Sequence, residues 1–166
     1  PHPPQRTDYA YRYPLPKANI LLHAGDLTKV GYRVEHEAMI AMLIDADAEL
    51  KLVIAGNHDI TLDEEYFTTF GYTRHQRPEQ LGEESILLSD DNLQTTLRTS
   101  SAKTPNTDSL KTYARSIKAL WTSESARNAG IIYLEEGIHS FTLSTGAKFT
   151  LYASPYQPEF YNWAFA

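Results

Sequence analysis

The chain contains no cysteine, which excludes several classes of chemistry at once. Without cysteine there is no disulfide, no thiolate-bound zinc, no iron–sulfur cluster and no cysteine nucleophile. No apolar run approaches the ~20 residues that a membrane-spanning helix needs. Positive charge is scarce, because 15 Lys and Arg stand against 21 Asp and Glu, for a formal charge of -6. An acidic chain is a poor match for a phosphate backbone, so we expect no coating of nucleic acid. Since no apolar run is long enough to span a bilayer, we expect no membrane partner either.

Signals for export are missing as well. The first residues lack the basic-then-apolar pattern of a signal peptide, so we expect a cytoplasmic protein. Five of the nine prolines fall within residues 1–17, which predicts an irregular, proline-rich lead-in. The 166 residues suffice for one domain with a real core, and 42% of them are hydrophobic. We place that domain at residues 18–166.

The first half of the domain alternates short apolar runs with helical patterns. Residues 18–24 and 51–55 are predicted as buried strands, and each run stops at a glycine. Apolar residues at helical spacing over 34–50 predict one helix, and 63–70, closed by Gly71, predicts a second. An order of strand, helix, strand and helix favours parallel strands joined by helical crossovers, which is the α/β fold class.

The second half is predicted to begin with a helix and to close with a hairpin. A polar stretch at 98–108 predicts a surface loop. An apolar stripe over 110–121 predicts a helix that ends near Gly130, with Asp108 or Ser109 as the N-cap. Three strands and a turn are predicted from the period-two pattern that follows, at 131–134, 138–143, 148–152 and 144–147.

Two loops carry polar side chains directly after the first two predicted strands. One begins Gly-Asp (25–26), and the other begins Gly-Asn-His-Asp (56–59). In an open parallel sheet, ligands bind beyond the carboxyl ends of the strands. If the two strands are neighbours, both loops therefore reach the same crevice. Each motif alone is commonly just a turn, and the pair at equivalent strand ends is what favours a site.

The residue types in these loops suit one kind of chemistry. Asp26 offers a carboxylate and Asn57 an amide oxygen, which are hard ligands for a divalent cation. His58 is placed to donate a proton to a bound substrate. Asp59 is predicted to hold the His58 ring and so to fix its tautomer. The chain has no Gly-x-Ser-x-Gly, Walker A or Gly-x-Gly-x-x-Gly motif, which argues against α/β-hydrolase, P-loop and dinucleotide-binding functions.

The remaining histidines and acids are predicted to have structural or solvent-facing positions. His23 lies inside an apolar run and is predicted to be a hydrogen-bonded core residue. His36 and His75 lie in polar stretches and are predicted to be solvated. Glu35 and Glu37 are predicted to lie on the solvent face of a helix.

The sequences of both loops are similar to signature blocks of the calcineurin-like metallophosphoesterase superfamily. Leu-His-Ala-Gly-Asp-Leu-Thr (22–28) and Ile-Ala-Gly-Asn-His-Asp (54–59) resemble its paired motifs. The stretch at 152–165 resembles the branch that holds the metallophosphoesterase-domain proteins and their fungal relatives. The resemblance covers about residues 18–166. It implies a sandwich of two mixed sheets flanked by helices.

The resemblance also implies a reaction. Members of the superfamily use two divalent metal ions (Mn, Fe, Zn or Mg), which activate a hydroxide that attacks a small phosphate-ester substrate. By position, Asp26 resembles the carboxylate that bridges the two metals, and Asn57 resembles an amide ligand of the second metal. His58 resembles the histidine that protonates the leaving group, with Asp59 as its orienting partner.

Two further blocks of the superfamily are absent from the 166 residues. These are an Asp-x-His before the first strand and a Gly-His-x-His near the C-terminal side. We therefore expect a fragment truncated at both ends, which lacks the first strand and the C-terminal part, and which binds metal weakly or not at all. Two alternatives stay open. One is a catalytically inactive, metallophosphoesterase-like binding or scaffold module, and the other is an ordinary α/β domain with an accidental motif match.

Overall fold

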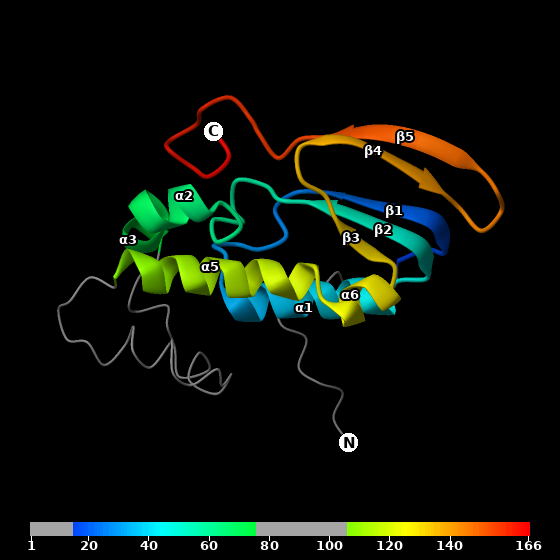
Figure 1. Cartoon of the computed structure of the whole chain (residues 1–166), viewed down its shortest axis with the longest axis horizontal. Helices are drawn as coiled ribbons and strands as arrows, with labels where there is room; N and C mark the ends of the chain where they lie inside the picture. Colours follow the sequence, from blue (N-terminus) through cyan, green and yellow to red (C-terminus); the bar gives the residue numbers. More distant parts are fainter. Residues whose placement is uncertain (1–14, 76–105) are drawn as a thin grey trace, which may run out of the picture.

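The computed structural model describes residues 15–75 and 106–166, which form three layers (Figure 1). Long helices form one layer, a three-stranded sheet lies in the middle, and a two-stranded sheet lies on the other side. Most of the predicted lead-in at 1–17 and most of the predicted loop at 98–108 fall outside the described residues. In chain order the elements are β1 (Ala18–Ala24), α1 (Arg33–Asp45), β2 (Ala48–Ile54), α2 (Glu64–Tyr66), the π-helical turn η1 (Phe67–Gly71), α3 (Tyr72–His75), α5 (Thr107–Trp121), α6 (Glu124–Asn128), β3 (Ile131–Tyr133), β4 (Gly137–Thr142) and β5 (Lys148–Ala153).

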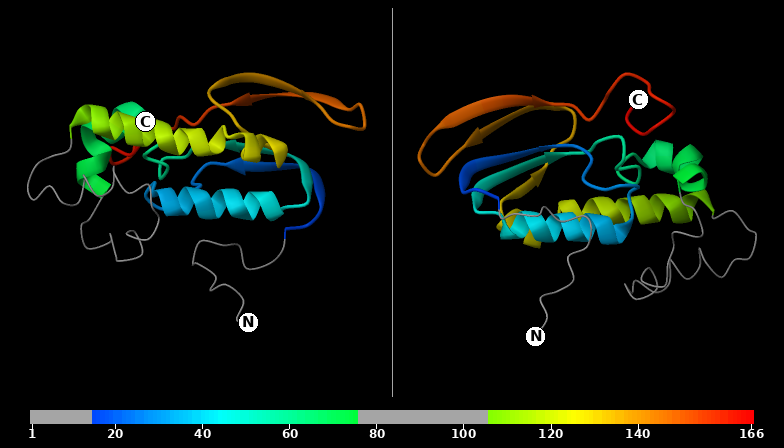
Figure 2. Two further views of the ribbon diagram at one scale, coloured as in Figure 1. Left: turned by 60° about the horizontal axis from the view of Figure 1, so that its bottom comes forward. Right: turned by 180° about the vertical axis from the view of Figure 1, so that it is seen from behind.

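The middle sheet is parallel and has the strand order β1-β2-β3. Ala18 pairs with Ala48 and Ala24 with Ile54, so β1 and β2 end at the same level. Helix α1 connects these two strands, and it lies with α5 on one face of the sheet (Figure 2). The predicted α/β class is confirmed, and the arrangement is consistent with part of a metallophosphoesterase fold.

A hydrophobic core fills the space between the sheet and the helices. Its largest fully buried apolar side chains are Trp121, Phe67, Leu43, Ile60, Ile117 and Ile131. Each such side chain contributes roughly 1.5–3 kcal/mol by leaving water. No helix in residues 15–75 or 106–166 combines the length and the apolar character needed to cross a membrane.

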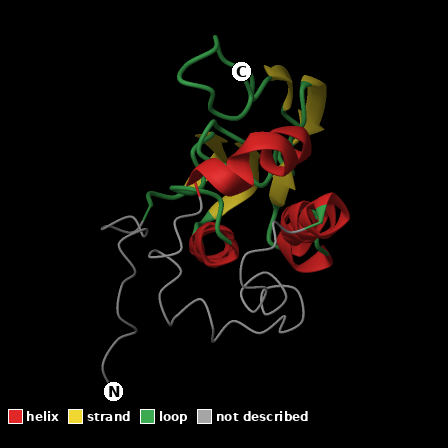
Figure 3. Ribbon diagram, turned by 90° about the vertical axis from the view of Figure 1, so that its left-hand side faces the viewer, coloured by secondary structure: helices red, strands yellow, loops and turns green. Residues whose placement is uncertain are grey.

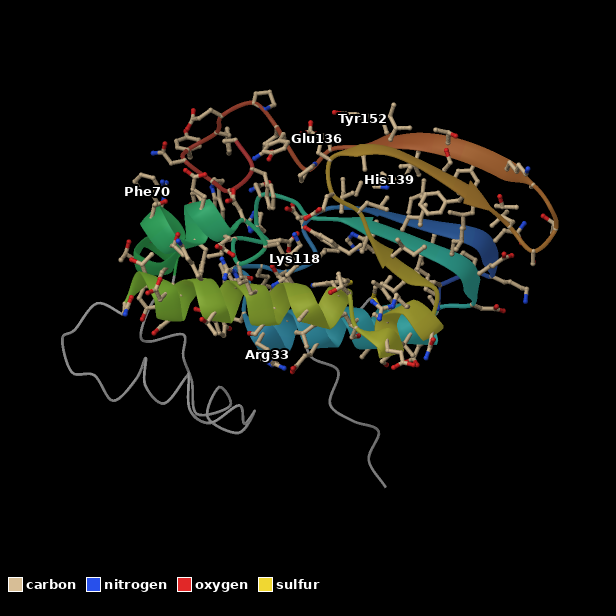
Figure 4. The ribbon with its side chains drawn as sticks, viewed as in Figure 1. Arg33, Phe70, Lys118, Glu136, His139 and Tyr152 are labelled. Carbon is tan, nitrogen blue, oxygen red and sulfur yellow. The ribbon has the colours of Figure 1, made fainter. Side chains whose placement is uncertain are left out.

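Strands β4 and β5 form the predicted antiparallel hairpin, with the turn at residues 144–147. Phe141 and Phe149 face each other across it and pack toward Leu52 of the middle sheet, in a second, smaller core. The outer face is open, because Ile138 and its cross-strand partner Tyr152 are both exposed. Figure 4 shows Tyr152 beside Glu136 on this outer side, and the Tyr152 hydroxyl donates to the Glu136 carboxylate at 2.9 Å.

Two predicted helix ends are wrong. Helix α1 stops at Asp45 rather than reaching residue 50, because Ala46 turns to an extended backbone and β2 starts at Ala48. The second helix does not end at Gly71, since η1 continues directly into α3. Gly71 serves packing instead of termination. A Cβ atom there would come within 2.9 Å of the Tyr66 ring.

The third predicted helix is in fact two helices. Its N-cap is Asn106, whose side chain accepts a hydrogen bond from the Asp108 N–H at 2.8 Å, so neither Asp108 nor Ser109 is the cap. Helix α5 ends at Trp121, well before Gly130. Ser123 then caps α6 by accepting from the Ala126 N–H. The helix is interrupted here because the Ser123 hydroxyl caps the start of a new helix directly after the first one ends.

Lys51 joins the ends of two helices beneath the sheet. It lies in β2 and is only 3% exposed. Its ammonium group donates to the carbonyl oxygen of Ala129 at 2.9 Å, just after α6, and to that of Ile44 at 3.4 Å, in the last turn of α1. A cation is favourable at both places, because the partial negative charge of a helix dipole lies at its C-terminus.

Replacing Lys51 by methionine is expected to lower the free energy of unfolding by about 1–2 kcal/mol. Methionine keeps the packing of the aliphatic stem but leaves two helix-end carbonyls without their donor. Urea unfolding followed by circular dichroism measures the change. Lys148→Met, at an exposed position of β5, is the matched control and is expected to be nearly neutral. Equal behaviour of the two variants would contradict the capping role.

Candidate functional site

The loops that follow β1 and β2 touch each other, as expected for neighbouring parallel strands. Their contact is backbone against backbone at two glycines. A Cβ atom on Gly25 would come within 2.8 Å of the Gly56 Cα, and one on Gly56 would come within 2.3 Å of the Asp26 nitrogen. Gly25 also has φ +96°, which side chains rarely allow. Only glycine at both places permits this approach.

Asp26 lies at the point where the two loops meet. Its backbone has φ 53°, in the left-handed region, and its side chain is exposed. Its Oδ1 accepts a hydrogen bond from the His58 backbone N–H at 3.3 Å. The second loop therefore brings the half-buried Asn57 and His58 to the Asp26 carboxylate. The structure thus places Asp26, Asn57 and His58 at the same end of the sheet.

Replacing Gly56 by alanine is expected to separate the loops. The new methyl group would meet Asp26 main chain at 2.3 Å and its Oδ1 at 2.5 Å, so Asp26 must move. We expect a loss of about 1–3 kcal/mol in the free energy of unfolding, typical of overpacking. The Asp26 and His58 amide resonances should shift in NMR spectra. Gly146→Ala is the control for the resonances, since it strains the backbone at φ +84° but its Cβ meets nothing within 4 Å, so the Asp26 and His58 resonances should stay in place. Unchanged Asp26 and His58 resonances would contradict the contact.

The His58 ring is held by a main-chain carbonyl. Its Nδ1 lies 2.6 Å from the carbonyl oxygen of Lys29, in the first loop. A carbonyl oxygen only accepts, so Nδ1 carries the proton. The neutral ring then has its lone pair on Nε2. His58 can thus exchange a proton with a ligand only through Nε2.

Asp59 does not hold the His58 ring, contrary to the sequence prediction. Its buried carboxylate points into the first loop and accepts four hydrogen bonds there and at Gly56. The N–H groups of Leu27 and Gly56 donate to Oδ2 at 3.0 and 2.7 Å. The N–H and hydroxyl of Thr28 donate to Oδ1 at 2.8 and 2.7 Å. Consecutive side chains in a tight turn point in different directions, which is why Asp59 and His58 do not meet.

The charge of Asp59 is set by opposing effects. Burial raises its pKa to about 6, while hydrogen bonds from Gly56, Thr28 and Leu27 act to lower the pKa. At neutral pH the group is therefore largely ionised. A carboxylate with four donors ties both loops together, so Asp59 is a positioning residue for the site and not a partner of the histidine.

Glu35 supports the first loop, although it was predicted to face solvent. It is 2% exposed, and its Oε2 accepts from the N–H groups of Val30 and Tyr32 at 3.1 and 3.0 Å. The reason is its place in the helix. Because α1 starts at Arg33, Glu35 is three residues after the N-cap Tyr32 and can reach back to it, as in a capping box. Locating the helix start more closely would have found this role.

His36 is fully buried, so its predicted solvation is wrong. The Trp121 Nε1–H donates to His36 Nδ1 at 3.1 Å, which leaves the ring proton on Nε2. The Nε2–H donates a hydrogen bond to Thr61 Oγ1 at 2.9 Å. The Thr61 hydroxyl in turn donates to the Gly31 carbonyl oxygen at 2.9 Å. Burial lowers the pKa of His36 to about 3. The neutral imidazole thus connects α5, α1 and the end of the first loop.

His23 is also placed differently from the prediction. It is half-buried, and its Nδ1 has no hydrogen-bond partner within the described residues. Burial lowers the pKa of His23, against the opposing effects of the Gly25 main chain and the Asp26 carboxylate. The His75 side chain lies outside the described residues.

The donors for a cation at this end of the sheet are few. The Asp26 carboxylate and the Asn57 amide fit a hard divalent cation in kind. Residues 15–75 and 106–166 contain no group of three or more histidine, cysteine or acidic side chains that could hold a metal ion. Within those residues, the candidate cation donors at this end of the sheet are therefore one carboxylate and one amide.

None of the protein-family models matches this chain. Metallophosphoesterase domain-containing protein 1 of Homo sapiens is 27% identical over 152 residues, and so is that of Mus musculus; the match covers 91% of this chain and 35% of each relative. Probable rhamnogalacturonate lyase C of Emericella nidulans is 45% identical over 60 residues, which are 36% of this chain and 6% of that protein. The distant match over most of this chain supports a metallophosphoesterase-like family. The chain spans about a third of these metallophosphoesterase-domain relatives.

Proposed function

We propose that the loops after β1 and β2 form part of the active site of a metal-dependent hydrolase of phosphate esters. The observation that carries the proposal is the contact of the two loops, through which the His58 N–H donates to Asp26 Oδ1. A carboxylate, an amide and an imidazole are thereby gathered at the carboxyl ends of two parallel strands, where α/β proteins bind ligands. The names of the two metallophosphoesterase-domain relatives agree with this chemistry.

Each residue of the site has a separate role in the proposal. Asp26 and Asn57 would hold a divalent cation, and His58 would give the Nε2 proton of its protonated ring to the leaving oxygen of the ester. Asp59 keeps the loops in place, and the Lys29 carbonyl fixes the tautomer of the neutral ring. A bound cation would supply charge neutralisation at the phosphoryl oxygens and an activated water. The net charge of -6 favours a small phosphomonoester or phosphodiester over a nucleic acid.

A manganese titration tests the cation role of Asp26 on this chain. We expect Mn²⁺ to broaden the NMR resonances of Asp26 and Asn57 first, because the paramagnetic ion relaxes nearby nuclei most strongly. Asp26→Asn should weaken the apparent affinity about 10–100-fold. Asp47→Asn is the control, since Asp47 is exposed and forms an ion pair with the exposed Lys17. Broadening that spares Asp26, or that survives in Asp26→Asn, would contradict the proposal.

The acid role of His58 is tested with a chromogenic phosphodiester in the presence of Mn²⁺. We expect His58→Ala to lower kcat about 100-fold while the Mn²⁺ affinity stays the same. A loss of metal affinity without a separate effect on kcat would assign His58 to the metal site instead. The reference for this comparison is the kcat of the unmodified chain under the same conditions.

A catalytically inactive binding or scaffold module is the second candidate function. It is favoured by the absence of a three-ligand metal group within residues 15–75 and 106–166. This candidate predicts that a phosphate ester perturbs the Asp26 and His58 resonances, while no hydrolysis occurs at any Mn²⁺ concentration. Turnover that depends on both residues would exclude it.

A further inference from the structure

The C-terminal segment, residues 154–166, returns to the end of the sheet where the two loops meet. Figure 1 shows it above α2, and Figure 3 shows the same segment above the helices from that end of the molecule. The Phe165 N–H donates to Asp63 Oδ2 at 3.1 Å, while Asp63 Oδ1 caps α2. The Asn162 carbonyl accepts from the Tyr66 hydroxyl at 2.6 Å and from Arg74 at 3.2 Å. The segment is therefore fixed to the structure that follows the second loop.

The backbone of this C-terminal segment is strained, and the contacts just described hold it in the strained conformation. Tyr161, Asn162 and Phe165 have φ of 51°, 51° and 57°, the left-handed region that non-glycine residues rarely adopt. Ala164 and Phe165 are nevertheless buried in the main core. Strain of this kind persists only where surrounding contacts enforce it, and it gathers at functional sites.

The strained segment places the Trp163 ring against His58. The ring centroids are 4.4 Å apart, and the ring planes are inclined by 35°. The Lys29 carbonyl already fixes one edge of the imidazole at Nδ1. With one edge hydrogen-bonded and one face covered, the ring has little freedom to rotate about its χ2 angle.

We propose that Trp163 is a positioning residue that holds the His58 imidazole with Nε2 directed to the bound ligand. The inference rests on the proposed function, because it gives His58 the role of proton donor. Its physical basis is separate, since it concerns the orientation and the tautomer of the ring. These two contacts hold the ring without a carboxylate partner, and the Asp59 carboxylate is engaged by the first loop.

The experiment compares the full chain with Trp163→Ala, Trp163→Phe and the control Phe160→Ala. Phe160 is an exposed aromatic residue of the same segment. Imidazole ¹⁵N shifts report the tautomer of His58 at a pH where the ring is neutral. We expect the Nδ1–H form to dominate in the unmodified chain and in Phe160→Ala. In Trp163→Ala the Nε2–H form should rise several-fold, and Trp163→Phe should restore most of the Nδ1–H form. Circular dichroism verifies that each variant is folded.

Kinetics on the same variants separate the two hypotheses. If the proposed function holds, Trp163→Ala lowers kcat about 10–100-fold with little change in KM, and Trp163→Phe recovers much of it. A tautomer change without any turnover by the unmodified chain would support the positioning role and contradict the hydrolase. An unchanged His58 tautomer in a folded Trp163→Ala chain would overturn the positioning role, whatever the turnover. If Trp163→Ala does not fold, the Trp163→Phe tautomer decides, since a phenyl ring must preserve the Nδ1–H form.

Discussion

Replacing Asp59 by alanine is expected to lower the free energy of unfolding by about 3–5 kcal/mol. The carboxylate accepts four hydrogen bonds from main-chain and hydroxyl donors in the two loops. Without it, these buried donors lose their common partner, and each unsatisfied group costs free energy. Urea unfolding at neutral pH measures the change. Asp47→Ala, which removes an exposed carboxylate, is the control and should cost less than about 1 kcal/mol.

The asparagine variant of Asp59 separates charge from shape. An amide has nearly the same volume, but its NH₂ group would face donors on whichever side it points, because donors surround both oxygens. Asp59→Asn should therefore destabilise almost as much as Asp59→Ala and should shift the Asp26 and His58 resonances. A nearly neutral Asp59→Asn would mean that the loops do not depend on the carboxylate. That outcome would also weaken the case for a shared site.

The meeting of the two loops was predictable from the sequence for a physical reason. A short apolar run stopped by glycine and a polar residue predicts a buried strand followed by a loop, and the pattern occurs twice, at 18–26 and 51–59. Parallel pairing in register then aligns the two ends without further information. The hairpin at the C-terminal side was predictable in the same way, because its strands and turn are adjacent in the chain.

The supporting contacts were not predictable, since they depend on positions distant in the sequence. His36 meets Trp121, which lies 85 residues away, and nothing near His36 indicates burial. Asp59 was assigned to His58 because the two are adjacent, although the turn directs them apart. Trp163 is 105 positions from His58, and only the fold of the C-terminal segment brings the rings together. Local patterns predict elements and their ends, while long-range polar contacts require the packed structure.

Acid should destabilise the protein through His36, and the sign follows from its burial. The ordinary pKa of histidine is 6.5, and burial lowers the pKa of His36 to about 3. Above pH 6.5 the ring is neutral in both the folded and the unfolded chain, so its contribution to stability is fully present. As the pH falls from 6.5 toward 3, His36 becomes protonated in the unfolded chain but stays neutral in the folded chain. The contribution shrinks by about 2–3 kcal/mol between pH 7 and pH 4.5.

Asp59 changes in the opposite direction and must be separated from His36. Its pKa is raised from 3.8 to about 6, so between these values the folded chain binds the extra proton and gains stability as the pH falls.

His36→Gln retains Asp59 and replaces the imidazole by an amide that does not titrate. The difference in unfolding free energy between the unmodified chain and His36→Gln, measured in urea from pH 7 to pH 4.5, therefore isolates the histidine. We expect the advantage of the unmodified chain to fall by about 2–3 kcal/mol over this range. Parallel curves would show that His36 takes up its proton in the folded state as readily as in the unfolded state, and that the chain from Trp121 to Gly31 does not hold a neutral ring.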